Sequence, residues 1–277
     1  MSTLSSTIDI DLRHPEEWRL SLRIEPKRVR FVAHSDCERD SLVGRDIELA
    51  GDCGEGIGAL ESCIYDNPFF LQDFKQVRIV AQSMRFMVVP EVVAAEHELA
   101  ARAFAALYGN AEGDIVADVL RGCGAAVVFE LPAGMLPFLN RTFFNVPVRH
   151  QLSALCEHFA RIGGRSGSGR LYAYLHDDMA DVVLFKGSGL ALANTFGCRT
   201  ADDAAFYILS VWNQHNLSQA TDELQLTGPR ETRDEVAQRL REYVTYVMPV
   251  MYPVAAMKMG KDSMKAPFDL ILTSLQP

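Results

Sequence analysis

Apolar residues alternate with polar ones near the start of the chain. Leu20, Leu22 and Ile24 are separated by single polar residues, and the same period returns after a turn at 25–27. A period of two is typical of a strand with one face buried. The pattern therefore predicts strands over 20–24, 29–33 and 42–49.

Further along the chain, short apolar strands alternate with segments of helical period. Thr200 followed by Asp202 and Asp203 is a typical helix start, because these side chains cap free backbone N–H groups. The pattern predicts helices over 57–65, 90–107, 132–138, 152–159, 200–215, 232–241 and 267–275. It predicts further strands over 77–80, 86–89, 125–131, 146–148, 170–175, 181–186, 190–195, 224–227 and 243–248.

The two halves of the chain repeat one order of elements, β-β-β-α-β-α-β, offset by roughly one domain length. Each half opens with Arg-Leu, at Arg19 and at Arg170. Hairpin-linked strands followed by alternating helices and strands predict a mixed sheet with helices on both faces. We therefore expect an α/β protein of the actin and sugar-kinase plan, with two ribonuclease-H-like lobes around a cleft. The predicted division is a flexible tail over 1–17, a first lobe over 18–147 and a second lobe over 148–277.

Composition narrows the classes of function. The 277 residues are 48% hydrophobic and carry a net charge of −9, which fits a globular protein and argues against a nucleic-acid partner. The basic residues Lys27, Arg28 and Arg30 are interpreted as a solvated strand edge. The start of the chain lacks the pattern of a signal peptide, and no stretch reaches the roughly 20 apolar residues of a membrane span. The six cysteines form no C-x-x-C pair, so we expect reduced thiols and a cytoplasmic location.

Several stretches resemble a bacterial family, mostly from Bacteroides relatives, catalogued as domain of unknown function 3822. The resemblance implies an actin-like ATPase fold, and the family has no assigned reaction. The matching stretches, which together cover most of residues 18–230, are 20–24, 77–80, 86–90, 129–132, 148–152, 171–185 and 202–212.

Nucleotide sites of actin type need glycine amides and carboxylates at three turns, because converging N–H groups hold the phosphates. The turn at 25–27 has Pro26 and no glycine, so an amide is missing there. The second turn offers Asp177 and Asp178, although aspartate also favours ordinary turns. The third turn, Thr227-Gly228, is the best match of the three, because in actin-type sites a glycine turn at this place lies against the adenosine. Any tight turn, however, also favours glycine. These four residues are the candidate nucleotide contacts, and no catalytic residue or metal ligand is assigned.

Two other segments have compositions that also occur at binding sites. The glycine-rich run 163–169 lacks the Gly-Lys-Ser/Thr ending of a phosphate loop and leads into a strand, so it is interpreted as a mobile connector. Methionines gather near the C-terminus, where they either fill gaps in packing or form an adaptable binding surface. They are Met248, Met251, Met257, Met259 and Met264.

Two hypotheses follow for the function. In the first, the chain is a non-enzymatic actin-like scaffold that acts through an unidentified protein partner, as do the actin-like subunits of pilus assembly and secretion machines, and it needs no cofactor. In the second, it binds ATP and Mg²⁺ as an ATPase or kinase. Working phosphoryl transfer requires positioning loops and metal together, and two of the three loops lack glycine, which favours the scaffold.

Overall fold

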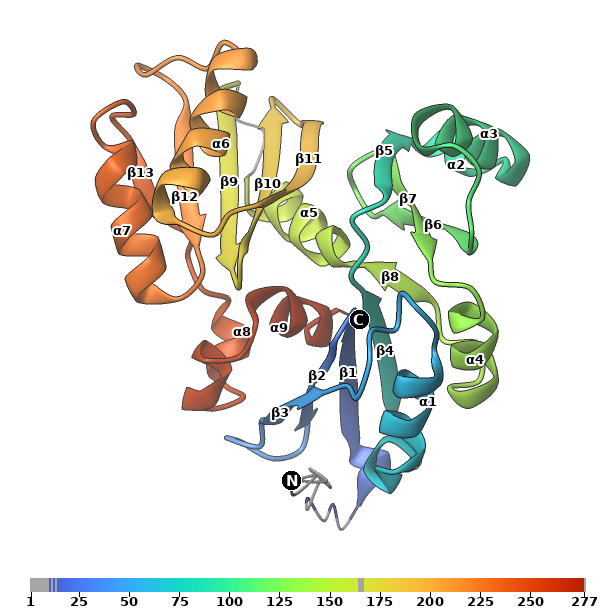
Figure 1. The fold of residues 1–277 in the computed structure, drawn as a ribbon. Coiled ribbons are helices and arrows are strands. Elements are labelled where there is room, and N and C mark those ends of the chain that lie inside the picture. Colours follow the sequence, from blue (N-terminus) through green and yellow to red (C-terminus); the bar gives the residue numbers. More distant parts are fainter. Residues whose placement is uncertain (1–9, 11, 13, 164–166, 277) are drawn as a thin grey trace.

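The computed structural model describes residues 10, 12, 14–163 and 167–276, which form two five-stranded sheets and one three-stranded sheet (Figure 1). Most of the predicted tail over 1–17 lies outside the described residues, apart from a 3₁₀ turn, η1 (Pro15–Glu17). The centre of the predicted connector, residues 164–166, lies outside them as well.

The first sheet has the order β3-β2-β1-β4-β8, with β1 antiparallel to β2 and parallel to β4. Its apolar face packs against α1 and α4, and the alternating Leu20, Leu22 and Ile24 lie in this core. The elements of this lobe are β1 (Trp18–Glu25), β2 (Arg28–Ser35), β3 (Val43–Glu48), α1 (Gly58–Tyr65), η2 (Pro68–Leu71), β4 (Gln76–Ala81), α4 (Met135–Thr142) and β8 (Val148–His150).

The second sheet repeats this order as β11-β10-β9-β12-β13, which confirms the repeat predicted from the sequence. Strand β9 is buried on both faces: Leu171 and Leu175 pack in a core with α6 and α7, whereas Tyr172 lies in the core shared with the first lobe. The elements are β9 (Gly169–His176), β10 (Met179–Lys186), β11 (Gly189–Gly197), α6 (Ala201–Gln214), β12 (Glu223–Thr227), α7 (Arg230–Leu240) and β13 (Val247–Pro249).

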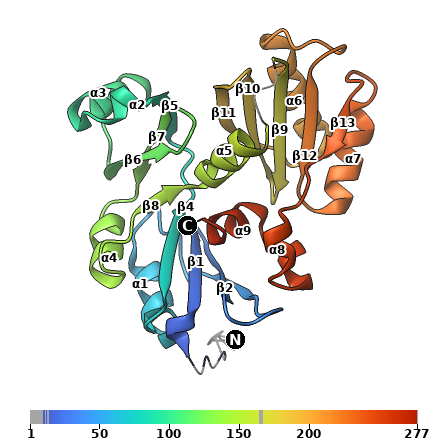
Figure 2. The same cartoon turned by 180° about the vertical axis from the view of Figure 1, so that it is seen from behind.

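Two helices cross between the lobes. Helix α5 (Gln151–Ile162) continues directly from β8 of the first sheet but packs against β10 and β11 of the second. Helix α9 (Phe268–Ser274), reached through α8 (Val254–Met257) and η3 (Lys261–Met264), returns to β1, β2 and β4 and also packs on α5 (Figure 2). One hydrophobic core therefore runs through both lobes, and the division of the chain at residue 148 stays a prediction.

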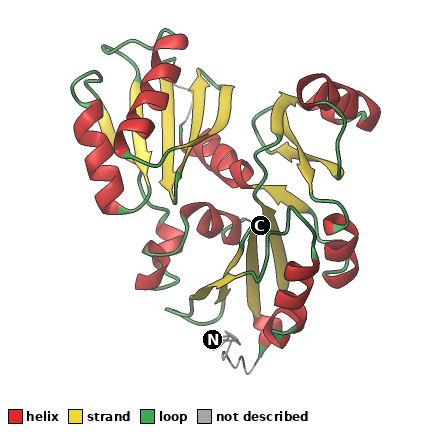
Figure 3. Ribbon diagram, viewed as in Figure 1, coloured by secondary structure: helices red, strands yellow, loops and turns green. Residues whose placement is uncertain are grey.

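The first lobe carries an inserted unit that the sequence pattern did not separate (Figure 3). A helix pair covers one face of a three-stranded antiparallel sheet of order β5-β7-β6, with Phe104 in the core between them. Its elements are β5 (Phe86–Pro90), α2 (Glu91–Ala94), α3 (His97–Tyr108), β6 (Asp114–Leu120) and β7 (Ala125–Leu131).

Three details of the sequence prediction were wrong. The single helix over 90–107 is two helices, because Glu96 adopts an extended backbone conformation between them. Strand β6 was not predicted, since Asp114 and Asp118 interrupt its apolar pattern. The strand expected over 243–248 begins at Val247, because the N–H groups of residues 243 and 244 close the end of α7 on the carbonyl of Leu240.

Candidate functional site

The polar face of β1 is buried between the lobes. Ser21, Arg23 and Glu25 alternate with the apolar residues of this strand, and the packing of α9 on β1 covers them. The side chain of Arg23 is 0% exposed. A half-buried strand would place these residues in water, so their burial marks a specific polar contact between the two halves of the molecule.

Arg23 contacts both helix α9 and the second sheet. Its Nη1 donates to Oδ2 of Asp269 at 2.8 Å, and its Nη2 lies 3.5 Å from Nδ1 of His176. Its Nε is 3.2 Å from Oε1 of Glu25 on the same strand. Oδ1 of Asp269 accepts a further hydrogen bond from the hydroxyl of Tyr174 at 3.3 Å. Buried charges need partners of this kind, because each carries a large desolvation cost.

Two arginines of β2 extend these contacts to the turn between β9 and β10. Nη2 of Arg30 donates to Oδ1 of Asp177 at 2.6 Å, and Nη2 of Arg28 lies 3.2 Å from the same oxygen. Both also pair with Glu25, at 2.7 Å from Arg28 and 3.3 Å from Arg30. The interpretation of Arg28 and Arg30 as a solvated strand edge was therefore wrong, because they pair inward across the lobes. Lys27 alone is exposed as expected.

His176, at the end of β9, is held between two carboxylates. Its Nε2 lies 2.9 Å from Oδ2 of Asp181, and its Nδ1 lies 3.6 Å from Asp177. Burial opposes its protonation, but Asp181 and Asp177 outweigh burial and raise the pKa of His176 to about 9. The other carboxylate oxygen of Asp181, Oδ1, accepts a hydrogen bond from the hydroxyl of Thr195 at 2.6 Å. The imidazolium is therefore the form present at neutral pH.

These residues form one connected set, which we call the cross-lobe network. Four cationic side chains face four carboxylates, and a fifth carboxylate, the exposed Asp46 of β3, lies 3.2 Å from Nε of Arg30. Every buried cation therefore has a carboxylate partner. The adjacent imidazolium of His176, together with Arg30 and Arg28, holds the pKa of the Asp177 carboxyl far below its usual range. The members are Arg23, Glu25, Arg28, Arg30, His176, Asp177, Asp181 and Asp269.

The four candidate residues from the sequence lie near one another but differ in their contacts. Asp177 belongs to the network and has a positive φ of 46°. Asp178 is exposed, and its backbone carbonyl accepts from the N–H of Cys198 at 2.7 Å. Thr227 is buried and is aligned with Tyr174 of β9 in the sheet. Gly228 lies directly against β9.

Gly228 is fixed by a close backbone approach. Its φ is 131°, and a Cβ placed there would lie 2.1 Å from the carbonyl oxygen of Leu175. That distance is far below any van der Waals contact, so only glycine fits. The packing of two strand ends therefore accounts for this glycine without any ligand.

The turn between β1 and β2 is closed by its own chain. The carbonyl of Pro26 accepts from the N–H of Cys53 at 2.7 Å, and that of Lys27 from the N–H of Leu49 at 2.8 Å. These two hydrogen bonds tie the turn, which contains no glycine, to the segment that follows β3. Within the described ranges, no three or more His, Cys, Asp or Glu side chains are grouped to hold a metal ion.

The alternation of charges along the first hairpin was the signal that the sequence interpretation missed. In the hairpin register Arg23 is opposite Arg30, and Glu25 is opposite Arg28. Two arginines facing each other across a pair of strands repel unless carboxylates separate them. Asp269 carries no comparable signal, because it lies 246 residues from Arg23.

The family model described as protein of unknown function (DUF3822) matches residues 7–247. The chain belongs to this family. Among curated proteins none matches it. None of the helices in the described part of the chain is both long and apolar enough to cross a bilayer.

Solved structures agree on the fold. A crystal structure from Bacteroides thetaiotaomicron VPI-5482, described as a protein with actin-like ATPase fold and unknown function, is 24% identical with a TM-score of 0.75. The match covers 95% of this chain and 98% of that one. The chain therefore has the actin-like ATPase fold.

More distant matches include the PilM–PilN type IV pilus biogenesis complex, at 13% identity, a TM-score of 0.48 and 94% and 99% coverage. Another is the AlfA filament bound to AMPPNP, at 9% identity, a TM-score of 0.41 and 93% and 94% coverage.

Proposed function

We propose that this chain is a non-catalytic scaffold of actin-like fold that acts through protein contacts. In this proposal the cross-lobe network occupies the space between the β1–β2 and β9–β10 turns, where a nucleoside triphosphate would otherwise bind. The observation that carries it is the pairing of Asp177 with Arg30, at 2.6 Å, between the β9–β10 turn and β2.

The charge balance of the network supports the proposal. Phosphates are held by cations and by converging N–H groups that have no other partner. Here Arg28 and Arg30 already share Glu25 and Asp177. A triphosphate between the turns would have to displace those carboxylates, and Glu25 is 7% exposed in its side chain. Leaving such a charge buried and unpaired costs free energy, so we expect the protein's own carboxylates to stay paired with the arginines when a triphosphate is present.

Phosphoryl transfer makes further demands. The transferred group must be positioned by loops, and metal ions must neutralise its developing charge. The β1–β2 turn has Pro26 where an amide is needed, and its carbonyls are bonded to the following loop. The proposal therefore assigns no catalytic residue to this chain.

One observation favours the second hypothesis, a site for ATP and Mg²⁺. Gly228 brings the β12–α7 turn against Leu175, so Thr227 and Gly228 lie beside the turn that carries Asp177 and Asp178. In this alternative the exposed Asp178 and the Gly228 backbone would contact the nucleotide. The two hypotheses predict opposite results with added nucleotide.

Thermal unfolding with millimolar ATP and Mg²⁺ separates them. A ligand at a hundred times its Kd adds about 2.7 kcal/mol of stability, which is readily detected. The scaffold hypothesis predicts no shift for the wild type. A clear shift that Asp178→Ala abolishes would establish the nucleotide site instead.

A paired variant tests the charge balance itself. Asp177→Ala leaves Arg28 and Arg30 with less compensation, so this variant should gain stability from inorganic tripolyphosphate when the wild type does not. Asp178→Ala, in the same turn but outside the network, is the matched control and should behave as the wild type. Equal responses of all three proteins to tripolyphosphate would contradict the proposal.

We also propose that the chain works in the cytoplasm. All six cysteines are free thiols. Burial raises the pKa of several of them to about 11, including Cys53 and Cys63, so they are unreactive at neutral pH. Free thiols in this number are usual in a reducing compartment.

A further inference from the structure

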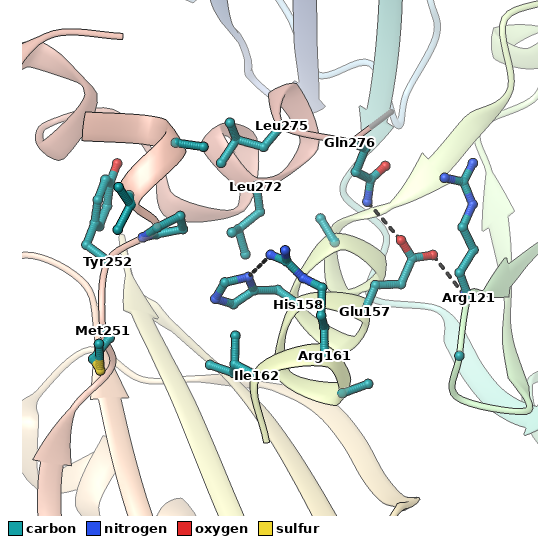
Figure 4. A pocket seen from close by; sticks show the side chains of 16 residues that line it. Arg121, Glu157, His158, Arg161, Ile162, Met251, Tyr252, Leu272, Leu275 and Gln276 are labelled. Carbon is teal, nitrogen blue, oxygen red and sulfur yellow. Dashed lines mark hydrogen bonds between the residues drawn. The ribbon is translucent and has the colours of Figure 1, made fainter. Parts of the chain in front are cut away.

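A cavity of about 760 Å³ lies where the two crossing helices meet the segment before α8. Leu272 of α9 and Leu275, directly after this helix, lie on one side of the cavity (Figure 4). Ala154 of α5 also lines it. Figure 4 shows Met251 and Tyr252 on the side opposite Arg121. The cavity is separate from the cross-lobe network, since no member of the network lines it.

The rim of the cavity is apolar and exposed. Met251 is 83% exposed, Val254 is 71% exposed and Ile162 is 44% exposed. Apolar side chains gathered around a cavity mark binding sites, and methionine adapts its shape to a partner. Of the C-terminal methionines, Met251 is thus on a surface suited to binding, whereas Met259 is packed in the core.

The polar residues of the cavity leave positive charge uncompensated. The one carboxylate, Glu157, is occupied by Arg149 at 2.6 Å, by Gln276 at 3.0 Å and by the N–H of Arg121 at 2.9 Å. Within the described residues, the guanidinium groups of Arg121 and Arg161 have no carboxylate within ion-pair distance.

The histidine in the cavity adds no charge. Burial and the neighbouring Arg161 lower the pKa of His158 to about 4, so its ring is neutral at pH 7 and accepts from Arg161 Nη2 at 3.2 Å. A chain with a net charge of −9 therefore carries a local positive site here, at the edge of an apolar cavity.

We infer that this cavity binds a segment of a partner protein that combines large apolar side chains with a carboxylate. The apolar side chains fill the cavity that α5 and α9 line, and the carboxylate lies against Arg161. A protein segment is favoured over a small molecule because it covers the exposed rim as well as the cavity. The inference rests on the proposed role in protein contacts and names the surface that performs it.

Selection from a random 12-residue peptide library tests this surface on the full chain. We expect the enriched peptides to contain at least two large apolar residues and an Asp or Glu. Ile162→Glu should weaken their binding more than tenfold, because it removes apolar contact and repels the carboxylate. Phe206→Glu is the matched control, since Phe206 is an exposed apolar helix residue, 65% accessible, outside the cavity.

Charge is tested separately. Arg161→Gln should weaken the same peptides about two- to fivefold, as expected for an exposed ion pair, and only those that carry the acid. Arg230→Gln, which changes the same charge on a side chain 86% exposed on α7, should leave binding unchanged. All four variants should melt within about 2 °C of the wild type, since each position is on the surface.

Each other outcome overturns the inference. Peptides that bind Ile162→Glu as tightly as the wild type would place the docking surface elsewhere and leave the scaffold function standing. Failure to enrich any peptide, with saturable binding of dodecanoate that Arg161→Gln weakens, would indicate a small amphipathic ligand. A dimer in sedimentation analysis that Ile162→Glu dissociates would indicate a second copy of this chain as the occupant.

Discussion

Replacement of Arg23 tests how much the cross-lobe network contributes to stability. Arg23 is fully buried, and its side chain reaches Asp269 at 2.8 Å and Glu25 at 3.2 Å. Methionine fills a similar volume but leaves Asp269 without its cation. Removing one partner of a buried ion pair costs about 3–5 kcal/mol, and we expect Arg23→Met to lose stability in this range.

The loss can be followed by urea unfolding with tryptophan fluorescence. The two tryptophans lie in different lobes, Trp18 at the start of β1 and Trp212 in α6. With a denaturant slope of about 3 kcal/mol/M, the expected loss lowers the midpoint by about 1–2 M. Because one core runs through both lobes, both signals should move together.

A second substitution separates charge pairing from packing. Asp269→Asn keeps the shape and the contact with Tyr174 but removes the charge that Arg23→Met leaves unpaired. The double variant should therefore be less destabilised than the sum of the single variants by about 1–3 kcal/mol. Strictly additive losses, or a cost below about 1 kcal/mol for Arg23→Met alone, would show that the pair does not hold the lobes together.

Three further results are expected. The pKa of His176 is raised to about 9 in the folded state, so the stabilisation it contributes is complete below about pH 6.5 and is lost as the pH rises through 9. The free energy of unfolding from urea titrations should therefore fall by up to about 3 kcal/mol between pH 6.5 and 9.5, and His176→Gln should flatten this slope. Gly228→Ala should cost about 3 kcal/mol or more of stability in thermal unfolding, because the new Cβ would meet the carbonyl of Leu175. The control Gly58→Ala has open space at the start of α1 and should be neutral or slightly stabilising. Equal effects of the two substitutions would contradict the close approach of Gly228 to Leu175. Phe104→Ala should cost about 3–5 kcal/mol of stability, because it opens a cavity in the core of the inserted unit. Amide hydrogen exchange should then rise first in β5, β6 and β7. Unchanged exchange in these strands would mean that the helix pair does not protect the sheet.

The fold could be predicted largely from periodicity. The sequence pattern predicted a strand over 170–175, and the structure has one there. It adds that this strand is buried on both faces, since Tyr172 and Leu171 lie in different cores. Repetition of the same element order in both halves predicted the two matching sheets. Strand β6 was not predicted, because it lies at the edge of its sheet, where the apolar pattern is weak and Val119 is 44% exposed.

The site was harder to predict than the fold. Asp177 was singled out for its turn, but its partners Arg28 and Arg30 come from the other lobe and were interpreted as solvent-exposed. The period of a strand tells which residues share a face, whereas the element that covers this face is set by tertiary packing. Here α9, at the far end of the chain, covers β1 and turns its polar face into an interior.

A crystal structure of the chain grown with saturating ATP and Mg²⁺ tests most directly whether the cross-lobe network excludes nucleotide. We predict that Asp177 stays within hydrogen-bond distance of Arg30 and that no nucleotide lies between the β1–β2 and β9–β10 turns. Nucleotide density there, with Asp177 turned away from both arginines, would contradict the proposed scaffold.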